Sequence, residues 1–182
     1  MNADHDLWDA ARVAALAAFT VLSASLLTGM ALRTALLAPL ARNRAVLALH
    51  GFLTWFWLPL VGVHVTALGT ARIGVLDLVV PFRVGYARLA VGLGTIGLLL
   101  LLLVGVTSAL RRRMSPRLWH AVHLLSYPMF GVFLLHAQLA GSDFSRTWIS
   151  VLGWATLGAL AMLALPRLAG GRVGTARPTT ES

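Results

Sequence analysis

Five long apolar stretches, separated by short polar segments, constrain the fold of this 182-residue chain more than any other feature. The clearest of them contains six consecutive leucines, Leu98 to Leu103, and no charged residue occurs between Arg88 and Arg111. A helix needs about 20 mainly apolar residues to cross the hydrocarbon core of a bilayer, where each backbone polar group must find its partner within the protein. The pattern therefore predicts an all-α fold, a polytopic membrane helix bundle with about five transmembrane helices.

The predicted spans divide the chain into three parts. We expect transmembrane helices over residues 12–32, 45–68, 86–110, 118–139 and 147–165. They form a membrane domain over 12–166, with an external N-terminal tail over 1–11 and a disordered cytoplasmic tail over 167–182. Only 12% of the residues are charged, against about 25% in a typical soluble domain, so we expect membrane lipid to contact much of the surface.

All 15 basic residues are arginines, and their distribution predicts the orientation of the chain. Ten of them follow the first, third or fifth predicted span, and five lie in the remaining segments. The positive-inside rule assigns the arginine-rich side to the cytoplasm, which places the N-terminus outside the cell membrane and the C-terminus inside. The arginines form no basic face with interleaved aromatic residues, so their expected partners are lipid headgroups and not nucleic acid.

Four histidines lie inside the predicted spans, where ionisable side chains are rare and tend to be functional. His50 and His64 are 14 residues apart in the second span, and His123 and His136 are 13 apart in the fourth. Both separations correspond to about 20 Å of helix, which nearly spans the hydrocarbon core. Because the second and fourth spans run in the same direction, His50 is expected level with His123 near the cytoplasmic face. His64 is expected level with His136 near the outer face.

Two cross-helix histidine pairs at matched depths are the metal ligands that two bis-imidazole b-type haems require. The chain has no cysteine, so each haem would be held without covalent attachment. At about 100° per residue, His50 and His64 lie roughly 40° apart around their helix, whereas His123 and His136 lie roughly 140° apart. We expect a kink at Pro128, which lacks a backbone N–H, to bring the second pair into phase.

Other residues are expected to contact these cofactors. Trp57 and Phe130 lie between the two haem levels and would fill the apolar gap. Arginines at helix ends are expected to pair with haem propionates, with Arg117 on the inner side and Arg83 and Arg88 on the outer side. Three glycines near the histidines would let a porphyrin approach the backbone: Gly51, Gly62 and Gly131.

Two other interpretations of the histidines remain open at this point. Membrane histidines also form hydrogen bonds between helices, in which case the chain is a non-redox protein, such as a transporter subunit or a helical adaptor. The same side chains could line a metal or proton path, although such a path normally includes intramembrane Asp or Glu, and the predicted spans have neither. His120, beside Trp119, is assigned no cofactor and is expected at the membrane interface.

The histidine spacing and its flanking motifs resemble the ferric-reductase-like transmembrane domain family over about residues 40–165. The resemblance rests on two histidine-bearing spans separated by one further span. It also rests on the basic segment Arg111-Arg112-Arg113 and on Trp119, four residues before His123. It implies transmembrane electron transfer through two stacked b haems with the same ligand pairs.

The resemblance also implies partners. Electrons would come from a cytoplasmic flavoprotein reductase or a quinol, and leave to an outer acceptor such as ferric iron, oxygen or a partner protein. Ferric reductases and NADPH oxidases carry a flavin and nicotinamide domain after the last span. Residues 167–182 are too few for such a domain, so we expect an oxidoreductase membrane component and no flavin in this chain.

Overall fold

The computed structural model describes residues 3–34, 42–71, 74–85 and 87–169, and within these ranges all regular secondary structure is helical. The elements are α1 (Ala3–Thr34), α2 (Asn43–Ala71), α3 (Val75–Val79), α4 (Arg88–Ala109), η1 (Arg111–Arg113), α5 (Pro116–His123), α6 (Ser126–Ala140), η2 (Ser142–Ser145) and α7 (Thr147–Ala169). Five segments of the described chain are long and apolar enough to cross a membrane: 5–32, 43–69, 88–109, 116–140 and 147–164. The five predicted spans are therefore confirmed.

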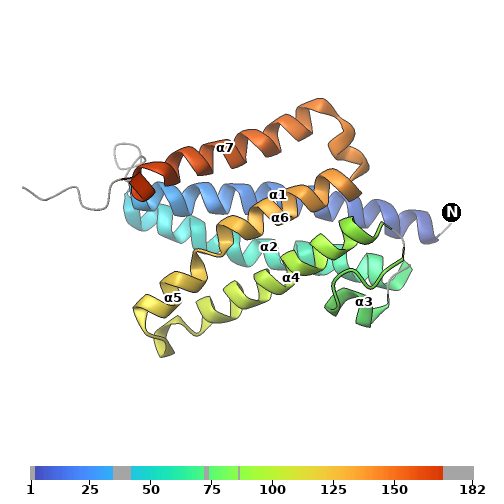
Figure 1. Cartoon of the computed structure of the whole chain (residues 1–182), viewed down its shortest axis with the longest axis horizontal. Coiled ribbons are helices and arrows are strands. Elements are labelled where there is room, and N and C mark those ends of the chain that lie inside the picture. The colour runs from blue at the N-terminus through green and yellow to red at the C-terminus, as the bar shows by residue number, and fades with distance from the viewer. Residues whose placement is uncertain (1–2, 35–41, 72–73, 86, 170–182) are drawn as a thin grey trace, which may run out of the picture.

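Two antiparallel helix pairs form the body of the bundle (Figure 1). α1 packs along α2, α4 packs along α6, and α7 lies against α1 and α6. The N-terminus and α3 lie at one end of the bundle, whereas α5 lies at the other end. Because α2 and α6 each pack mainly against another helix, the histidines of α2 and those of α5 and α6 belong to different helix pairs.

The first helix is longer than the sequence pattern predicts. α1 begins at Ala3, so nine of the eleven residues expected as an N-terminal tail are helical. At the other end of the chain, α7 continues to Ala169, and residues 170–182 of the expected cytoplasmic tail lie outside the described residues. The additional turns of α1 reach His64, one of the two histidines predicted to lie near the outer face, as described below.

Capping residues set the start of the fourth span. The side chain of Ser115 accepts a hydrogen bond from the backbone N–H of Leu118 at 3.3 Å. Pro116 occupies the first helical position, where its missing N–H removes no helical hydrogen bond and its fixed φ favours the helix. α5 therefore starts two residues before the predicted span, and its last residue is His123.

A break at Leu124 and Leu125 separates α5 from α6. Pro128 cannot donate to the carbonyl of Leu124, and that carbonyl instead accepts from the N–H of Tyr127 at 3.2 Å. The N–H of Leu125 likewise bonds to Val122, three residues back, at 3.0 Å. Each such 3₁₀ step turns the chain by about 120° instead of 100°. Figure 1 shows α5 and α6 meeting at an angle at this break.

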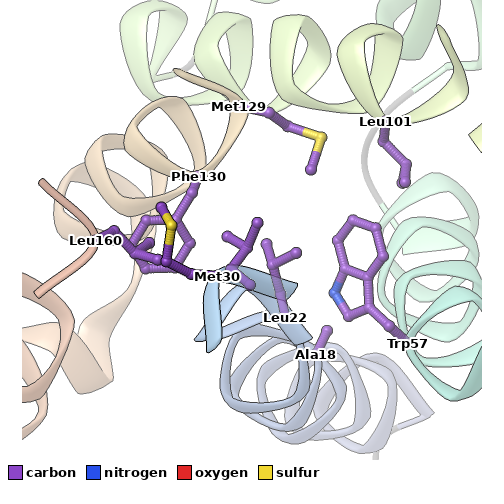
Figure 2. Packing of buried hydrophobic residues seen from close by; sticks show 9 residues of the cluster. Ala18, Leu22, Met30, Trp57, Leu101, Met129, Phe130 and Leu160 are labelled. Atoms are coloured by element: carbon purple, nitrogen blue, oxygen red, sulfur yellow. The ribbon is translucent and has the colours of Figure 1, made fainter. Parts of the chain in front are cut away.

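A buried apolar cluster occupies the middle of the bundle (Figure 2). Its side chains converge from α1, α2, α4, α6 and α7, and include Ala18, Leu22, Met30, Trp57, Leu101, Met129, Phe130 and Leu160. Large apolar side chains on the outer surface of the helices are exposed instead, including Trp55 and Met162 at 71% and 72%. A water-soluble bundle would bury side chains of this size, so this surface is suited to contact with lipid.

Candidate functional site

The four membrane histidines form two facing pairs. His50 on α2 faces His123 at the end of α5, with ring centroids 6.4 Å apart and ring planes at 83°. His64 on α2 faces His136 on α6, with centroids 6.3 Å apart and planes at 73°. The structure therefore brings together the pairs that topology predicts. The break between α5 and α6 accounts for the second pair, because its 3₁₀ steps reduce the phase difference between His123 and His136.

Hydrogen bonds to neighbouring helices orient three of these rings. Each of the three donates its Nδ1–H to a backbone carbonyl: His50 to Ser25 (2.8 Å), His64 to Ala11 (2.9 Å) and His136 to Ala90 (2.7 Å). A carbonyl oxygen can only accept, so the proton of a neutral ring lies on Nδ1 and the lone pair on Nε2. This is the tautomer that a metal ligand bonded through Nε2 requires.

The ring of His123 has a different environment. Its Nδ1 lies 3.3 Å from the hydroxyl of Ser108 on α4, and either group can act as the donor. The indole of Trp119 stacks on the ring of His123, with centroids 5.0 Å apart and planes at 23°. His120, which the sequence places at the interface, is only partly buried and contacts the edge of Trp119.

Two glycines allow imidazole rings to lie against helix backbones. A Cβ built on Gly94 of α4 would lie 2.8 Å from the ring of His136, and one on Gly29 of α1 would lie 3.0 Å from the ring of His50. The three glycines singled out from the sequence make no such contact. A Cβ built on Gly51, Gly62 or Gly131 would meet nothing within 4 Å. Those three positions face open space, whereas Gly29 and Gly94 shape the histidine sites.

A cavity of about 580 Å³ is lined by both His64 and His136, which are called the outer pair because the predicted orientation places them near the outer face. Its volume falls within the range of about 300–1,000 Å³ that is usual for small-molecule and cofactor sites. Most of the lining is apolar and comes from α1, α2, α4 and α6. Among the described residues of the lining, the charged side chains are Arg12 and Asp143, neither of which was singled out from the sequence.

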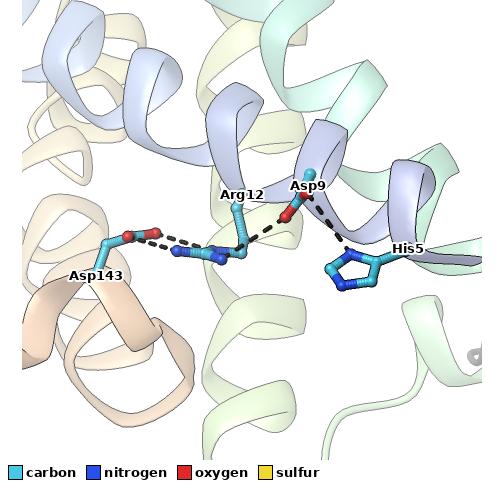
Figure 3. A network of polar contacts seen from close by, with 4 residues as sticks. All are labelled: His5, Asp9, Arg12 and Asp143. Carbon is cyan, nitrogen blue, oxygen red and sulfur yellow. Dashed lines mark hydrogen bonds and ion pairs between the residues drawn. The ribbon is translucent and has the colours of Figure 1, made fainter.

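Arg12 and Asp143 join α1 to η2 through a two-point contact (Figure 3). Nε and Nη2 of Arg12 donate to the two carboxylate oxygens of Asp143 at 3.1 and 2.7 Å. These hydrogen bonds are the main reason that the pKa of Asp143 lies below its usual value. Nη1 of Arg12 lies 3.7 Å from Asp9, which in turn lies 3.6 Å from Nδ1 of His5.

The arginines predicted to pair with propionates lie elsewhere. Nε of Arg83 is 3.1 Å from the carboxylate of Asp77, and Nε of Arg88 donates to the carbonyl of Phe82 at 2.8 Å. Both arginines are exposed, and neither lines the outer cavity. Arg117 is exposed in the first turn of α5, the helix that carries His123.

The side chains predicted to lie between the two histidine levels are buried there. Trp57 is seven residues from both His50 and His64 and is 5% exposed, and Phe130 is fully buried. Trp57 contacts Phe133 edge-on with centroids 5.9 Å apart. Aromatic and aliphatic side chains therefore lie between the two pairs, and Trp57 and Phe133 also line the cavity beside His64 and His136.

In the part of the chain that the structure describes, no three or more His, Cys, Asp or Glu side chains gather into one metal-binding group, so the histidines occur as pairs. Comparisons with protein-family models, curated proteins and solved structures give no match to this chain. Its function is therefore argued from the geometry of the two histidine pairs.

Proposed function

We propose that this chain carries electrons across the membrane through two b-type haems. His50 and His123 would hold the inner haem, and His64 and His136 the outer one. The haems supply one-electron redox chemistry, and the protein sets their position, their exclusion from water and their potential. The proposal agrees with the resemblance to the ferric-reductase-like transmembrane domain.

The observation that carries the proposal is the spacing of the rings within each pair. A metal–imidazole nitrogen bond is about 2.0 Å long and a ring nitrogen lies about 1.2 Å from its ring centroid, so two imidazoles on opposite sides of one metal have centroids about 6.4 Å apart. The observed separations are 6.4 and 6.3 Å. Histidines that hydrogen-bond directly to each other would have their ring nitrogens about 2.9 Å apart. Their ring centroids would then be closer together than the centroids of two rings that share a metal.

Two further observations favour haem over a metal ion bound by the protein alone, and a third, the tautomer of the rings, suits either. Each site offers two histidines, and a porphyrin would supply four more nitrogens, whereas structural zinc takes four protein ligands. The hydrogen bonds from Nδ1 to carbonyls hold the rings in the tautomer with the lone pair on Nε2. The cavity beside the outer pair is predominantly apolar, which suits the body of a porphyrin.

The proposed path of the electron runs from the cytoplasmic side to the outer side, in agreement with the resemblance, and the predicted orientation assigns each haem to one side. With the arginine-rich side in the cytoplasm, the donor is a cytoplasmic flavoprotein reductase or a quinol, and the inner site accepts the electron. The outer site passes it to ferric iron, oxygen or a partner protein outside. The chain is then the membrane component of an oxidoreductase.

The test is the haem content of the chain purified in detergent. We expect a b-type reduced-minus-oxidised spectrum and a pyridine haemochrome value of about two haems per chain. Absence of a b-type signal would overturn the proposal and favour a non-redox membrane protein whose histidines join helices. A value of one haem per chain would limit the proposed haem binding to one of the two histidine pairs.

A further inference from the structure

The third turn of α1 contributes twice to the outer site. The carbonyl of Ala11 accepts the Nδ1–H of His64, and the next residue, Arg12, lines the cavity beside His64 and His136. Arg12 is the one cationic side chain among the described residues of this lining. The same short segment therefore orients one imidazole and brings a permanent positive charge to an otherwise mainly apolar cavity.

The guanidinium of Arg12 can bind more than Asp143. It has five N–H donors, and Asp143 takes one hydrogen bond from Nε and one from Nη2. Nη1 lies 3.7 Å from Asp9, which is longer than the 2.7–3.2 Å usual for an N–H···O hydrogen bond. A second carboxylate can thus bind to Arg12 while the contact with Asp143 persists.

A ligand of this cavity must bury an apolar body and direct an anionic group towards Arg12. Haem b has this form, since its porphyrin is flat and apolar and carries two propionates on one edge. We propose that Arg12 binds a propionate of the outer haem, and that Asp143 holds the guanidinium at the cavity and partly offsets its charge. This inference rests on the proposed haem function.

Arg12 and Asp143 are expected to shift the midpoint potential of the outer haem in opposite directions. Reduction adds an electron, so a nearby positive charge favours the reduced haem and a nearby negative charge opposes it. Arg12→Gln removes the positive charge and is expected to lower the midpoint potential of the outer haem. Asp143→Asn removes a negative charge and is expected to raise it. If the ion pair served only to join α1 to η2, both variants would change the potential of the outer haem in the same direction, because either substitution breaks the ion pair.

The experiment is a potentiometric titration of the haem spectrum in the purified wild-type protein and in each variant. His64→Ala identifies which of the two potentials belongs to the outer haem. We expect opposite shifts of that potential in Arg12→Gln and Asp143→Asn, an unchanged inner potential in both, and a value near wild type in Arg12→Lys, which keeps the charge. Arg83→Gln is the matched control, since it removes a cation paired with Asp77 that does not line the cavity.

Shifts of the same sign in Arg12→Gln and Asp143→Asn, or an equal shift in Arg83→Gln, would overturn the assignment of Arg12. If Arg12→Gln loses the outer haem altogether, the Asp143→Asn variant distinguishes propionate binding by Arg12 from a purely structural ion pair. Retention of the haem with a raised potential supports propionate binding by Arg12, and loss of the haem there too identifies a structural ion pair. A wild-type protein without haem would instead refute the proposed function, so the two failures are distinct.

Discussion

The Nδ1–H of His64 donates to the backbone carbonyl of Ala11, 53 residues earlier in the chain, at 2.9 Å. α1 therefore fixes the orientation of a ring on α2, and that ring faces His136 on α6. Three of the four histidines are oriented in this way by α1 or α4, helices that carry none of the proposed ligands. The geometry of the two sites therefore depends on how the helices pack together.

Replacing single histidines is expected to remove one haem at a time. His64→Ala and His136→Ala should each abolish the outer haem and leave the inner one, because a bis-imidazole site fails when either ligand is lost. His50→Ala and His123→Ala should do the reverse. Pyridine haemochrome assays and redox titrations measure the remaining haem, and His120→Ala should retain both. Loss of both haems from a well-folded His64→Ala protein contradicts the pairing.

Gly94→Ala is expected to disrupt the outer site selectively. Its Cβ would lie 2.8 Å from the ring of His136, so the ring or α4 must move, and such overpacking costs about 1–3 kcal/mol. Gly105→Ala in the same helix is the matched control, because its Cβ meets nothing within 4 Å and alanine favours a helix by about 0.5–1 kcal/mol. Outer-haem occupancy and thermal unfolding in detergent provide the comparison, and equal behaviour of the two variants would refute the contact.

The near-perpendicular rings predict a characteristic electron paramagnetic resonance spectrum. The ring planes meet at 83° in the inner pair and 73° in the outer pair. Perpendicular imidazoles interact with different iron d orbitals and leave two of them close in energy, which gives a strongly anisotropic low-spin ferric signal. We expect such signals from both sites. Two rhombic spectra typical of parallel imidazoles would show that the rings rotate when haem binds.

The contact between Arg12 and Asp143 predicts a loss of stability in acid. Hydrogen bonds from Arg12 keep the pKa of Asp143 below its usual value, so ionised Asp143 stabilises the folded state above the unfolded pKa of about 3.9. This stabilisation is lost as the pH falls through the lower folded pKa. Thermal unfolding of the wild-type protein and Asp143→Asn should therefore differ at about pH 6, where Asp143 is ionised in both states, and the difference should shrink as the pH falls through the lowered folded pKa. A difference independent of pH would contradict this role of the carboxylate.

The helices and the histidine pairs could be predicted because they depend on patterns that every membrane helix obeys. Apolar length marks a span, and the spacings of 14 and 13 residues convert directly into matched depths. The start of α1 was placed too late, because the charged residues Asp9 and Arg12 resemble the border of a span. In the bundle Arg12 forms ion pairs with both Asp9 and Asp143, at the end where the N-terminus lies.

The finer features of the sites required the helix packing. The carbonyls that accept from the histidines belong to Ser25, Ala11 and Ala90, and any residue type has such a carbonyl. The role of Gly94 likewise depends on which face of α4 meets α6. Arg83 and Arg88 were assigned to the outer site from their position at the start of a span, but their side chains bond to Asp77 and Phe82.

The break at Leu124 and Leu125 has a structural consequence for the two sites. It leaves His123 on a helix of eight residues and His136 on a separate helix of fifteen, so the two proposed ligands of the fourth span belong to different helices. α2 carries the histidine that faces each of them. The two proposed haem sites therefore share one helix and differ in the other, so a substitution in α5 can alter the geometry of one site and leave the second ligand of the fourth span in place.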